Sequence, residues 1–176
     1  MPRILLTLLV LSASCASAAP ASILTLLYNT DDLTFLQNES SEAASSTTSR
    51  LSQDQAQTIA ADLKASLASD NPRDPIYLAK QLANVGMLQT YAGDLTAGDQ
   101  SLRAALSHFN QNQSLFDPRL PRLLSAIGIN GFLREDYDTA EDHFRWSQNI
   151  QHRSHGLFAA EQTPNLNWLT RVYLST

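Results

Sequence analysis

The sequence predicts an all-α fold in which antiparallel helix pairs stack into a solenoid. From residue 51 onward, apolar residues recur at steps of three and four, which places them along one face of a helix. Similar residues return after 42 positions, as expected of a repeated helix-pair unit. Within each unit, small residues stand opposite large apolar ones at the spacing that closely packed helices require.

The composition fits one domain with an acidic balance of charge. The chain has 176 residues, of which 43% are hydrophobic, and its formal net charge is −5. This length allows one domain with a real core and is too short for two ordinary domains. Because the composition recommends no basic surface, we expect neither nucleic acid nor an anionic membrane as a partner.

Residues 1–18 predict a signal peptide. Arg3 precedes an apolar run at residues 4–11, and small residues at 16–18 favour cleavage after Ala18. The apolar run is too short to span a bilayer. We therefore expect a secreted or periplasmic protein.

Cys15 is the only cysteine and leaves a second interpretation open. A lipidated Cys15 would tether the chain as a structural outer-membrane lipoprotein, although Leu11 stands one step too far upstream of the usual lipidation pattern. With cleavage after Ala18, the exported chain has no cysteine and no disulfide, which fits a bacterial periplasm or medium.

Residues 19–50 are expected to form a lead-in segment and a flexible linker. Apolar clusters between residues 23 and 36 fit either a short hairpin or an irregular helix. Residues 38–50 are rich in Ser, Thr, Glu and Ala without apolar periodicity, which indicates the linker.

Residues 51–70 predict a degenerate leading helix at the start of a repeat domain that covers residues 51–176. Ser52 is a plausible N-cap ahead of an acidic first turn. The expected apolar face contains Ala56, Ile59, Ala60, Leu63 and Leu67. Pro72 stops this helix, and Asp74 followed by proline begins the next one.

Residues 74–115 and 117–158 predict two copies of the helix-pair unit. The corresponding residues are Gly86 and Gly128, Leu102 and Phe144, and Gly98 and Ala140. We expect the first glycine of each copy to let the second helix approach closely, and the large residue to fill the seam.

The turns inside the two copies differ. Gly93 is well placed to end its helix in the left-handed conformation. Glu135 stands at the matching position and lacks that freedom, so we expect the second turn to close differently.

These residues carry a family resemblance. The pattern Leu-x-x-[Val/Ile]-Gly, then [Gly/Glu]-Asp-[Leu/Tyr]-x-x-[Gly/Ala]-x-x-x-[Leu/Phe]-x-x-[Ala/Ser], resembles the tetratricopeptide repeat. The 42-residue spacing is similar to the extended repeats of kinesin light chains and their bacterial relatives. Gln89 and Gly131 depart from the pattern, where the family has a large apolar residue, and we expect Leu88, Tyr91 and Phe132 to compensate by packing.

Residues 162–176 predict the start of a third repeat or a cap. Leu166, Leu169, Val172 and Tyr173 are expected to share one face of this helix. Solenoids usually end in a polar-faced capping helix. Either this helix caps the stack, or the chain is a fragment of a longer array, which is the interpretation we favour and which would leave room for an effector domain after Thr176.

The resemblance implies a superhelix with a concave groove, lined by the first helix of each pair, in which the family binds extended peptides or partner helices. Transferred to this sequence, the groove candidates are Lys80, Ala83, Asn84, Met87, Tyr91, Arg122, Ser125, Ile129, Phe132, Asn167 and Arg171. Asparagine and arginine suit peptide backbones and carboxylates because their donors have fixed planar geometry.

We expect no catalytic residue, no cofactor and no metal. The sequence has no HExxH motif, Gly-x-Ser-x-Gly elbow or glycine-rich phosphate loop. An alternative is a metal-dependent enzyme built on His143, His152 and His155, although the helix macrodipole favours histidines at a helix end without a metal. The sequence therefore predicts an exported scaffold that binds another protein or a peptide.

Overall fold

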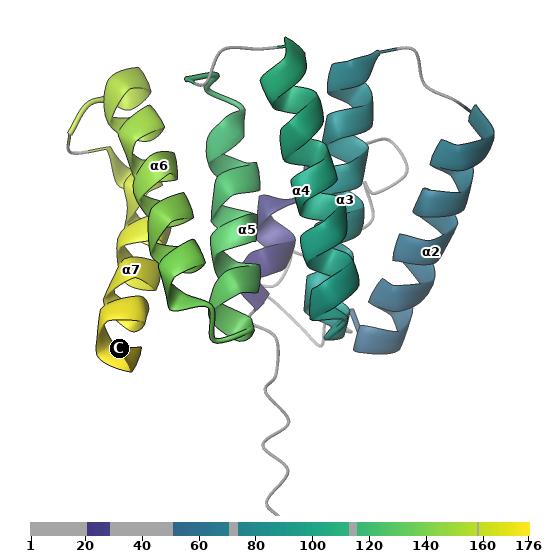
Figure 1. Cartoon of the computed structure of the whole chain (residues 1–176), viewed down its shortest axis with the longest axis horizontal. Coiled ribbons are helices and arrows are strands. Elements are labelled where there is room, and N and C mark those ends of the chain that lie inside the picture. Colours follow the sequence, from purple (N-terminus) through teal and green to yellow (C-terminus); the bar gives the residue numbers. More distant parts are fainter. Residues whose placement is uncertain (1–20, 29–50, 71–73, 113–115, 158) are drawn as a thin grey trace, which may run out of the picture.

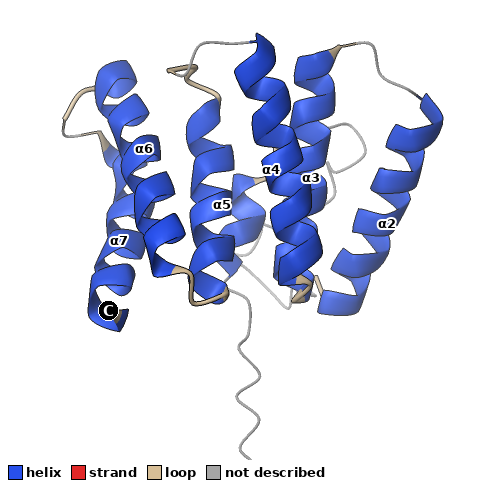
Figure 2. Cartoon of the chain, in the orientation of Figure 1, coloured by secondary structure: helices blue, strands red, loops and turns tan. Residues whose placement is uncertain are grey.

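The computed structural model describes residues 21–28, 51–70, 74–112, 116–157 and 159–176. These residues form two short 3-10 helices and six α-helices, with no strand among them (Figure 2). The elements are η1 (Ala21–Leu26), α2 (Gln53–Asp70), α3 (Pro75–Ala92), α4 (Leu95–Asn112), α5 (Leu120–Leu133), α6 (Tyr137–His155), η3 (Ala160–Gln162) and α7 (Thr163–Ser175). The all-α prediction is confirmed for this part of the chain. The predicted signal peptide, Cys15 and the predicted linker lie outside the described residues.

The helices pack against their neighbours in the chain, from α2 to α7 (Figure 1). In addition, α5 contacts both α3 and α7, so the first helix of each predicted pair touches the next first helix. The segment η1, purple in Figure 1, lies against α3 and α5. None of the described helices has the length and apolarity that a membrane crossing requires.

Local sequence signals explain where α2 and α3 begin. The Ser52 hydroxyl accepts from the Gln55 N–H at 3.1 Å, and the Gln55 side chain accepts from the Ser52 N–H at 2.8 Å, which is a capping box. The predicted face of α2 packs into the core through Ala56, Ile59, Ala60, Leu63 and Leu67. Asp74 caps α3 by accepting from the Ile76 N–H at 2.9 Å.

The glycine seams confirm the predicted close approach inside each helix pair. A Cβ atom on Gly86 would lie 2.6 Å from the Leu102 Cγ atom, and a Cβ atom on Gly128 would lie 2.8 Å from the Phe144 ring. Leu102 and Phe144 are fully buried. The large side chain of the second helix therefore fills the space that the missing Cβ leaves on the first.

The two turns inside the pairs close in the same way, which corrects the prediction for Glu135. Gly93 has φ 93° and Glu135 has φ 62°, so both lie in the left-handed region. The N–H of Asp94 donates to the Gln89 carbonyl at 2.9 Å. In the second pair, the N–H of Asp136 donates to the Gly131 carbonyl, also at 2.9 Å. The fold imposes the same turn even where a side chain makes it unfavourable.

The two departures from the repeat pattern are accommodated by different contacts. The Gln89 side chain is buried and accepts a hydrogen bond from the Ser101 hydroxyl at 2.8 Å. At Gly131 a Cβ atom would lie 3.3 Å from the Ala140 backbone nitrogen, so the chain itself approaches closely there. As expected, Leu88 is fully buried and Tyr91 and Phe132 pack against the core.

Helix α7 corrects the predicted apolar face. Its buried residues are Asn165, Trp168, Leu169 and Val172. Leu166 and Tyr173 are 46% and 50% exposed. The reason is that α7 packs against α5 and α6 on one side, and no described helix covers the side that carries Leu166.

Candidate functional site

Residues 21–28, here called the docked segment, cover part of the face that α3 and α5 form together. Ile23, Leu27 and Tyr28 are buried, with 1%, 7% and 5% of their surface exposed. Leu24 and Leu26 pack at the edge of the same core. Of the two structures that the sequence left open here, the structure shows a short helix, η1. The face that α3 and α5 form therefore holds a peptide from elsewhere in the chain.

The side chain of Asn84 holds the backbone of the docked segment. The Tyr28 N–H donates to Asn84 Oδ1 at 2.7 Å, and Asn84 Nδ2 donates to the Tyr28 carbonyl at 3.1 Å. Asn84 is fully buried on α3. A carboxamide has one acceptor and one donor in the same plane as a peptide group, so it can pair with a backbone of any sequence.

The Tyr28 side chain fixes the end of the docked segment. Its hydroxyl donates to the Arg119 carbonyl at 2.7 Å, just before α5 begins. Its ring lies 6.4 Å from the ring of Phe109 on α4. Burial raises the pKa of the phenol well above its usual range, so Tyr28 stays neutral and acts as a hydrogen-bond donor.

A cavity of about 340 Å³ opens beside Tyr28. We call it the basic cavity, and it is lined by Tyr28, Lys80, Pro118, Arg119 and Arg122. Its cations come from α3, from the residue before α5 and from the first turn of α5. Packing, and not a run of basic sequence, brings the three charges together.

Arg119 is already paired in the basic cavity. Its guanidinium donates to both carboxylate oxygens of Asp117, at 2.9 and 2.6 Å. The hydrogen bonds from Arg119 hold the pKa of Asp117 below its usual range, so Asp117 is ionised at neutral pH. Lys80 is half-buried and Arg122 is exposed, and no carboxylate among the described residues forms an ion pair with either.

A second cavity, of about 420 Å³, lies on the first turns of α7. Its walls are Ala160, Thr163, Pro164, Asn167, Trp168 and Arg171. The Arg171 guanidinium lies 4.7 Å from the centre of the Trp168 ring. Trp168 stacks on Phe144 at 6.0 Å and meets Phe132 edge-on at 5.4 Å, so the aromatic wall is rigidly supported.

The predicted groove residues divide by exposure. Arg122, Asn167 and Arg171 are exposed, and Lys80, Tyr91 and Phe132 are half-buried. The other candidates, Ala83, Asn84, Met87, Ser125 and Ile129, are buried. The docked segment is part of what buries Asn84. The Tyr91 hydroxyl donates to the Leu51 carbonyl at 2.8 Å, so Tyr91 ties α3 to the start of α2.

Ser125 is buried because it belongs to a polar network between α5, α6 and α7. Its hydroxyl lies 2.7 Å from both the Pro121 carbonyl and Asn165 Oδ1. Asn165 Nδ2 in turn donates to the Ser147 hydroxyl at 2.6 Å. These groups satisfy one another, so Ser125 holds the helices together and is not available to a ligand.

No protein-family model, curated protein or solved structure matches this chain. The tetratricopeptide resemblance therefore stays a prediction. What supports it is the recurrence after 42 residues together with the matching seams and turns of the two helix pairs.

The structure does not bring together the ligands of the alternative metal site. Among the described residues, no three His, Cys, Asp or Glu side chains are placed to hold a metal ion. His143 Nδ1 instead donates to the Thr139 carbonyl at 2.8 Å, one turn earlier on α6. This hydrogen bond satisfies His143 Nδ1 within its own helix.

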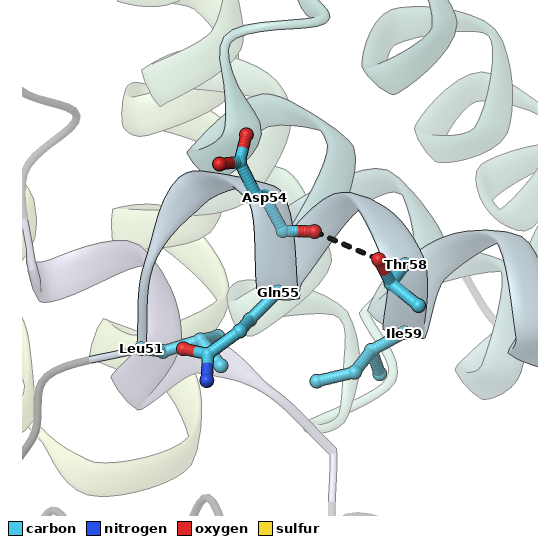
Figure 3. A pocket seen from close by; sticks show the side chains of 5 residues that line it. All are labelled: Leu51, Asp54, Gln55, Thr58 and Ile59. Atoms are coloured by element: carbon cyan, nitrogen blue, oxygen red, sulfur yellow. Dashed lines mark hydrogen bonds between the residues drawn. The ribbon is translucent and has the colours of Figure 1, made fainter.

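A third cavity, of about 310 Å³, lies on α2 (Figure 3). Leu51 and Ile59 line its apolar part, and Figure 3 shows the Asp54 carboxylate pointing away from them. The Thr58 hydroxyl donates to the Asp54 carbonyl at 2.9 Å, and the Gln55 side chain is engaged in the capping box. Polar groups do not converge on this cavity, so we assign it no role.

Sequence reasoning missed the docked segment and Arg119. The segment was visible only as an apolar cluster before a polar linker, which had to be buried against some surface. Arg119 escaped notice because its place in the cavity depends on Lys80, 39 positions earlier in the chain.

Proposed function

We propose that this chain is an exported, non-catalytic scaffold of the tetratricopeptide type that binds a peptide segment of another protein. In this proposal α3–α4 and α5–α6 are two repeats of a solenoid, and α7 is the first helix of a third. The groove is the face formed by α3, α5 and α7. The matching glycine seams and turns support this arrangement of the helices.

One observation carries the binding function: Asn84 pairs with both backbone groups of Tyr28 while three apolar side chains of the docked segment are buried beside it. The backbone contact does not depend on sequence, and the buried side chains select apolar and aromatic residues. A partner peptide would use the same contacts. The docked segment then acts as an internal competitor that the partner displaces.

The binding of a peptide at Asn84 can be measured in the full chain. A protease site inserted between residues 38 and 50 allows the folded protein to be cut, after which the released segment can exchange. We expect a synthetic peptide with the sequence of residues 20–28 to compete with the cut segment for the same face. Asn84→Ala removes two hydrogen bonds worth about 1 kcal/mol each, so it should weaken retention of the segment by about 30-fold.

Asn149→Ala is the matched control, because Asn149 is exposed on α6. Its cut segment should dissociate as slowly as that of the unsubstituted protein. Circular dichroism shows whether each variant keeps its helices. Equal dissociation rates for Asn84→Ala and the unsubstituted chain, with helices intact, would mean that Asn84 does not hold a peptide.

The proposed partner can be sought with a photo-crosslinking residue at Asn167, in the α7 cavity, and a control at Asn149. We expect a discrete adduct from Asn167 in cells, diminished by the peptide of residues 20–28. Adducts that form equally at both positions would contradict binding at this face.

A further inference from the structure

We infer that the groove selects segments with a tyrosine at the place of Tyr28, and that Asp117 is the positioning residue for this selection. The inference rests on the proposed function and specifies which segments the groove accepts. It starts from one contact of the docked segment: the Tyr28 hydroxyl donates to the Arg119 carbonyl at 2.7 Å. A segment with phenylalanine at this place has no donor for that carbonyl.

The Tyr28 side chain is buried, so its hydroxyl depends on a protein acceptor. The ring packs toward the ring of Phe109, with 6.4 Å between their centres. Burial raises the pKa of the phenol well above its usual range, so the group stays neutral and donates its proton to the hydrogen bond. A site that hydrogen-bonds a hydroxyl discriminates against an analogue without it, because the acceptor is then left unpaired.

The acceptor carbonyl belongs to a turn that Asp117 holds from several sides. Asp117 Oδ1 accepts from the Arg119 backbone N–H at 2.8 Å and from Arg119 Nε at 2.9 Å. The Leu120 N–H, which is in the same peptide group as the Arg119 carbonyl, donates to the Asp117 carbonyl at 3.0 Å. These bonds fix the peptide group and therefore the direction in which its carbonyl points toward Tyr28.

The first helix pair contains the same turn with fewer bonds. Asp74 is followed by proline, as Asp117 is, and its Oδ1 accepts from the Ile76 N–H at 2.9 Å. Ile76 stands at the place of Arg119 and has no side-chain donor for the carboxylate. A turn that only begins a helix thus forms without the side-chain pair. The pair is added at the turn whose carbonyl binds Tyr28, which supports a role in holding that carbonyl.

The buried side chains of the docked segment set the rest of the preferred sequence. Ile23 and Leu27 are buried five positions and one position before Tyr28. We therefore expect the partner segment to carry an apolar residue, three further residues, a second apolar residue and then tyrosine. Phenylalanine is more apolar than tyrosine, so a groove that recognised apolar surface alone would prefer phenylalanine. A preference for tyrosine separates the hydrogen bond from apolar burial.

Two synthetic peptides test the selection on the cut full-length protein. Both have the sequence of residues 20–28 with a C-terminal amide, and one of them carries Tyr28→Phe. The amide keeps the Tyr28 carbonyl that Asn84 binds and adds no charge. We expect the tyrosine peptide to displace the cut segment at a concentration about tenfold lower, as one partly buried hydrogen bond allows.

Variants of Asp117 test its positioning role, because the ratio of two peptides measured on one protein does not depend on the stability of that protein. In Asp117→Ala the advantage of the tyrosine peptide should fall below about threefold. Asp117→Asn keeps an oxygen for the Arg119 N–H and should retain more of the advantage. Asp74→Ala is the matched control: it opens the corresponding turn without removing a hydrogen bond of Arg119 and should keep the full advantage.

The outcomes separate the selection from the proposed function. If both peptides displace the cut segment equally well, or phenylalanine is preferred, the groove binds peptides and the selection of tyrosine is wrong. If neither peptide displaces it, the proposed function fails and the inference fails with it. An unchanged advantage in Asp117→Ala removes Asp117 from the selection.

A measurement within the chain checks the same hydrogen bond without an added peptide. Tyr28→Phe should speed the dissociation of the cut segment by about tenfold. Circular dichroism shows whether the helices of this variant are intact. An unchanged dissociation rate with intact helices would mean that the Arg119 carbonyl does not select the hydroxyl.

Discussion

The two helix pairs reach the same geometry with different residues. In α3–α4 the seam is filled by Leu102 and the turn uses Gly93, whereas in α5–α6 the seam is filled by Phe144 and the turn uses Glu135. The hydrogen bonds that close the two turns match. The packing of the pair thus determines the turn, and the residue at the turn only sets how much strain the turn carries.

Substitutions that fill the glycine seams should have the largest effect on the stability of the two helix pairs. Gly128→Ala would place a Cβ atom 2.8 Å from the Phe144 ring, and Gly86→Ala would place one 2.6 Å from the Leu102 Cγ atom. Overpacking of this kind costs about 1–3 kcal/mol, which exceeds the gain of about 1 kcal/mol from helix propensity. We expect both variants to lower the free energy of unfolding in urea.

A double-mutant cycle tests whether contact with the Phe144 ring causes the loss of stability in Gly128→Ala. Phe144→Leu creates space beside residue 128, so Gly128→Ala should cost less in that background than in the unsubstituted chain. Gly86→Ala is the control, because its contact is with Leu102 in the other pair. Its cost should not change when Phe144 is replaced. Equal costs of Gly128→Ala in both backgrounds would show that the ring does not limit the approach.

The turns should respond in opposite directions to substitution. Gly93→Ala puts a side chain into the left-handed region and should destabilise the protein by about 1 kcal/mol. Glu135→Gly removes that strain and should stabilise it by about 0.5 kcal/mol, since the flexible unfolded glycine cancels part of the gain. Urea unfolding measures the change in the free energy of unfolding for both variants. Stabilisation by Gly93→Ala would contradict the left-handed turn.

These two pairs also show what the sequence could predict. The capping box at Ser52, the cap at Asp74 and the glycine seams follow from residues close in the chain or from the repeat itself, so they were predictable. The turn at Glu135 was predicted wrongly, because local preference disfavours a left-handed glutamate and only the packed pair overrides it.

The candidate site was less predictable than the helices. Asn84 was identified as a groove residue, but its contact with Tyr28 joins positions 56 residues apart that no repeat relates. Met87 and Ile129 were expected to be accessible and are buried, because helical spacing identifies a face without showing what covers it. Leu166 is exposed for the converse reason: no described helix covers its side of α7, although Leu169 and Val172 of the same predicted face are buried.

The smallest effect we expect comes from Asp117, whose carboxylate forms two hydrogen bonds with the guanidinium of Arg119 at the basic cavity. Its pKa is lower in the folded state than in the unfolded chain, because Arg119 hydrogen-bonds to it. The folded state therefore resists protonation, and the stability that this pair contributes is complete above roughly pH 5. It is lost as the pH falls below about 4 and through the folded-state pKa.

Asp117→Asn should lower the free energy of unfolding at pH 7 by about 0.5–1 kcal/mol, since the Arg119 side chain is partly exposed to solvent. The difference from the unsubstituted chain should vanish in acid. A difference that persisted in acid would show that the charge of the Asp117 carboxylate does not carry the stabilisation.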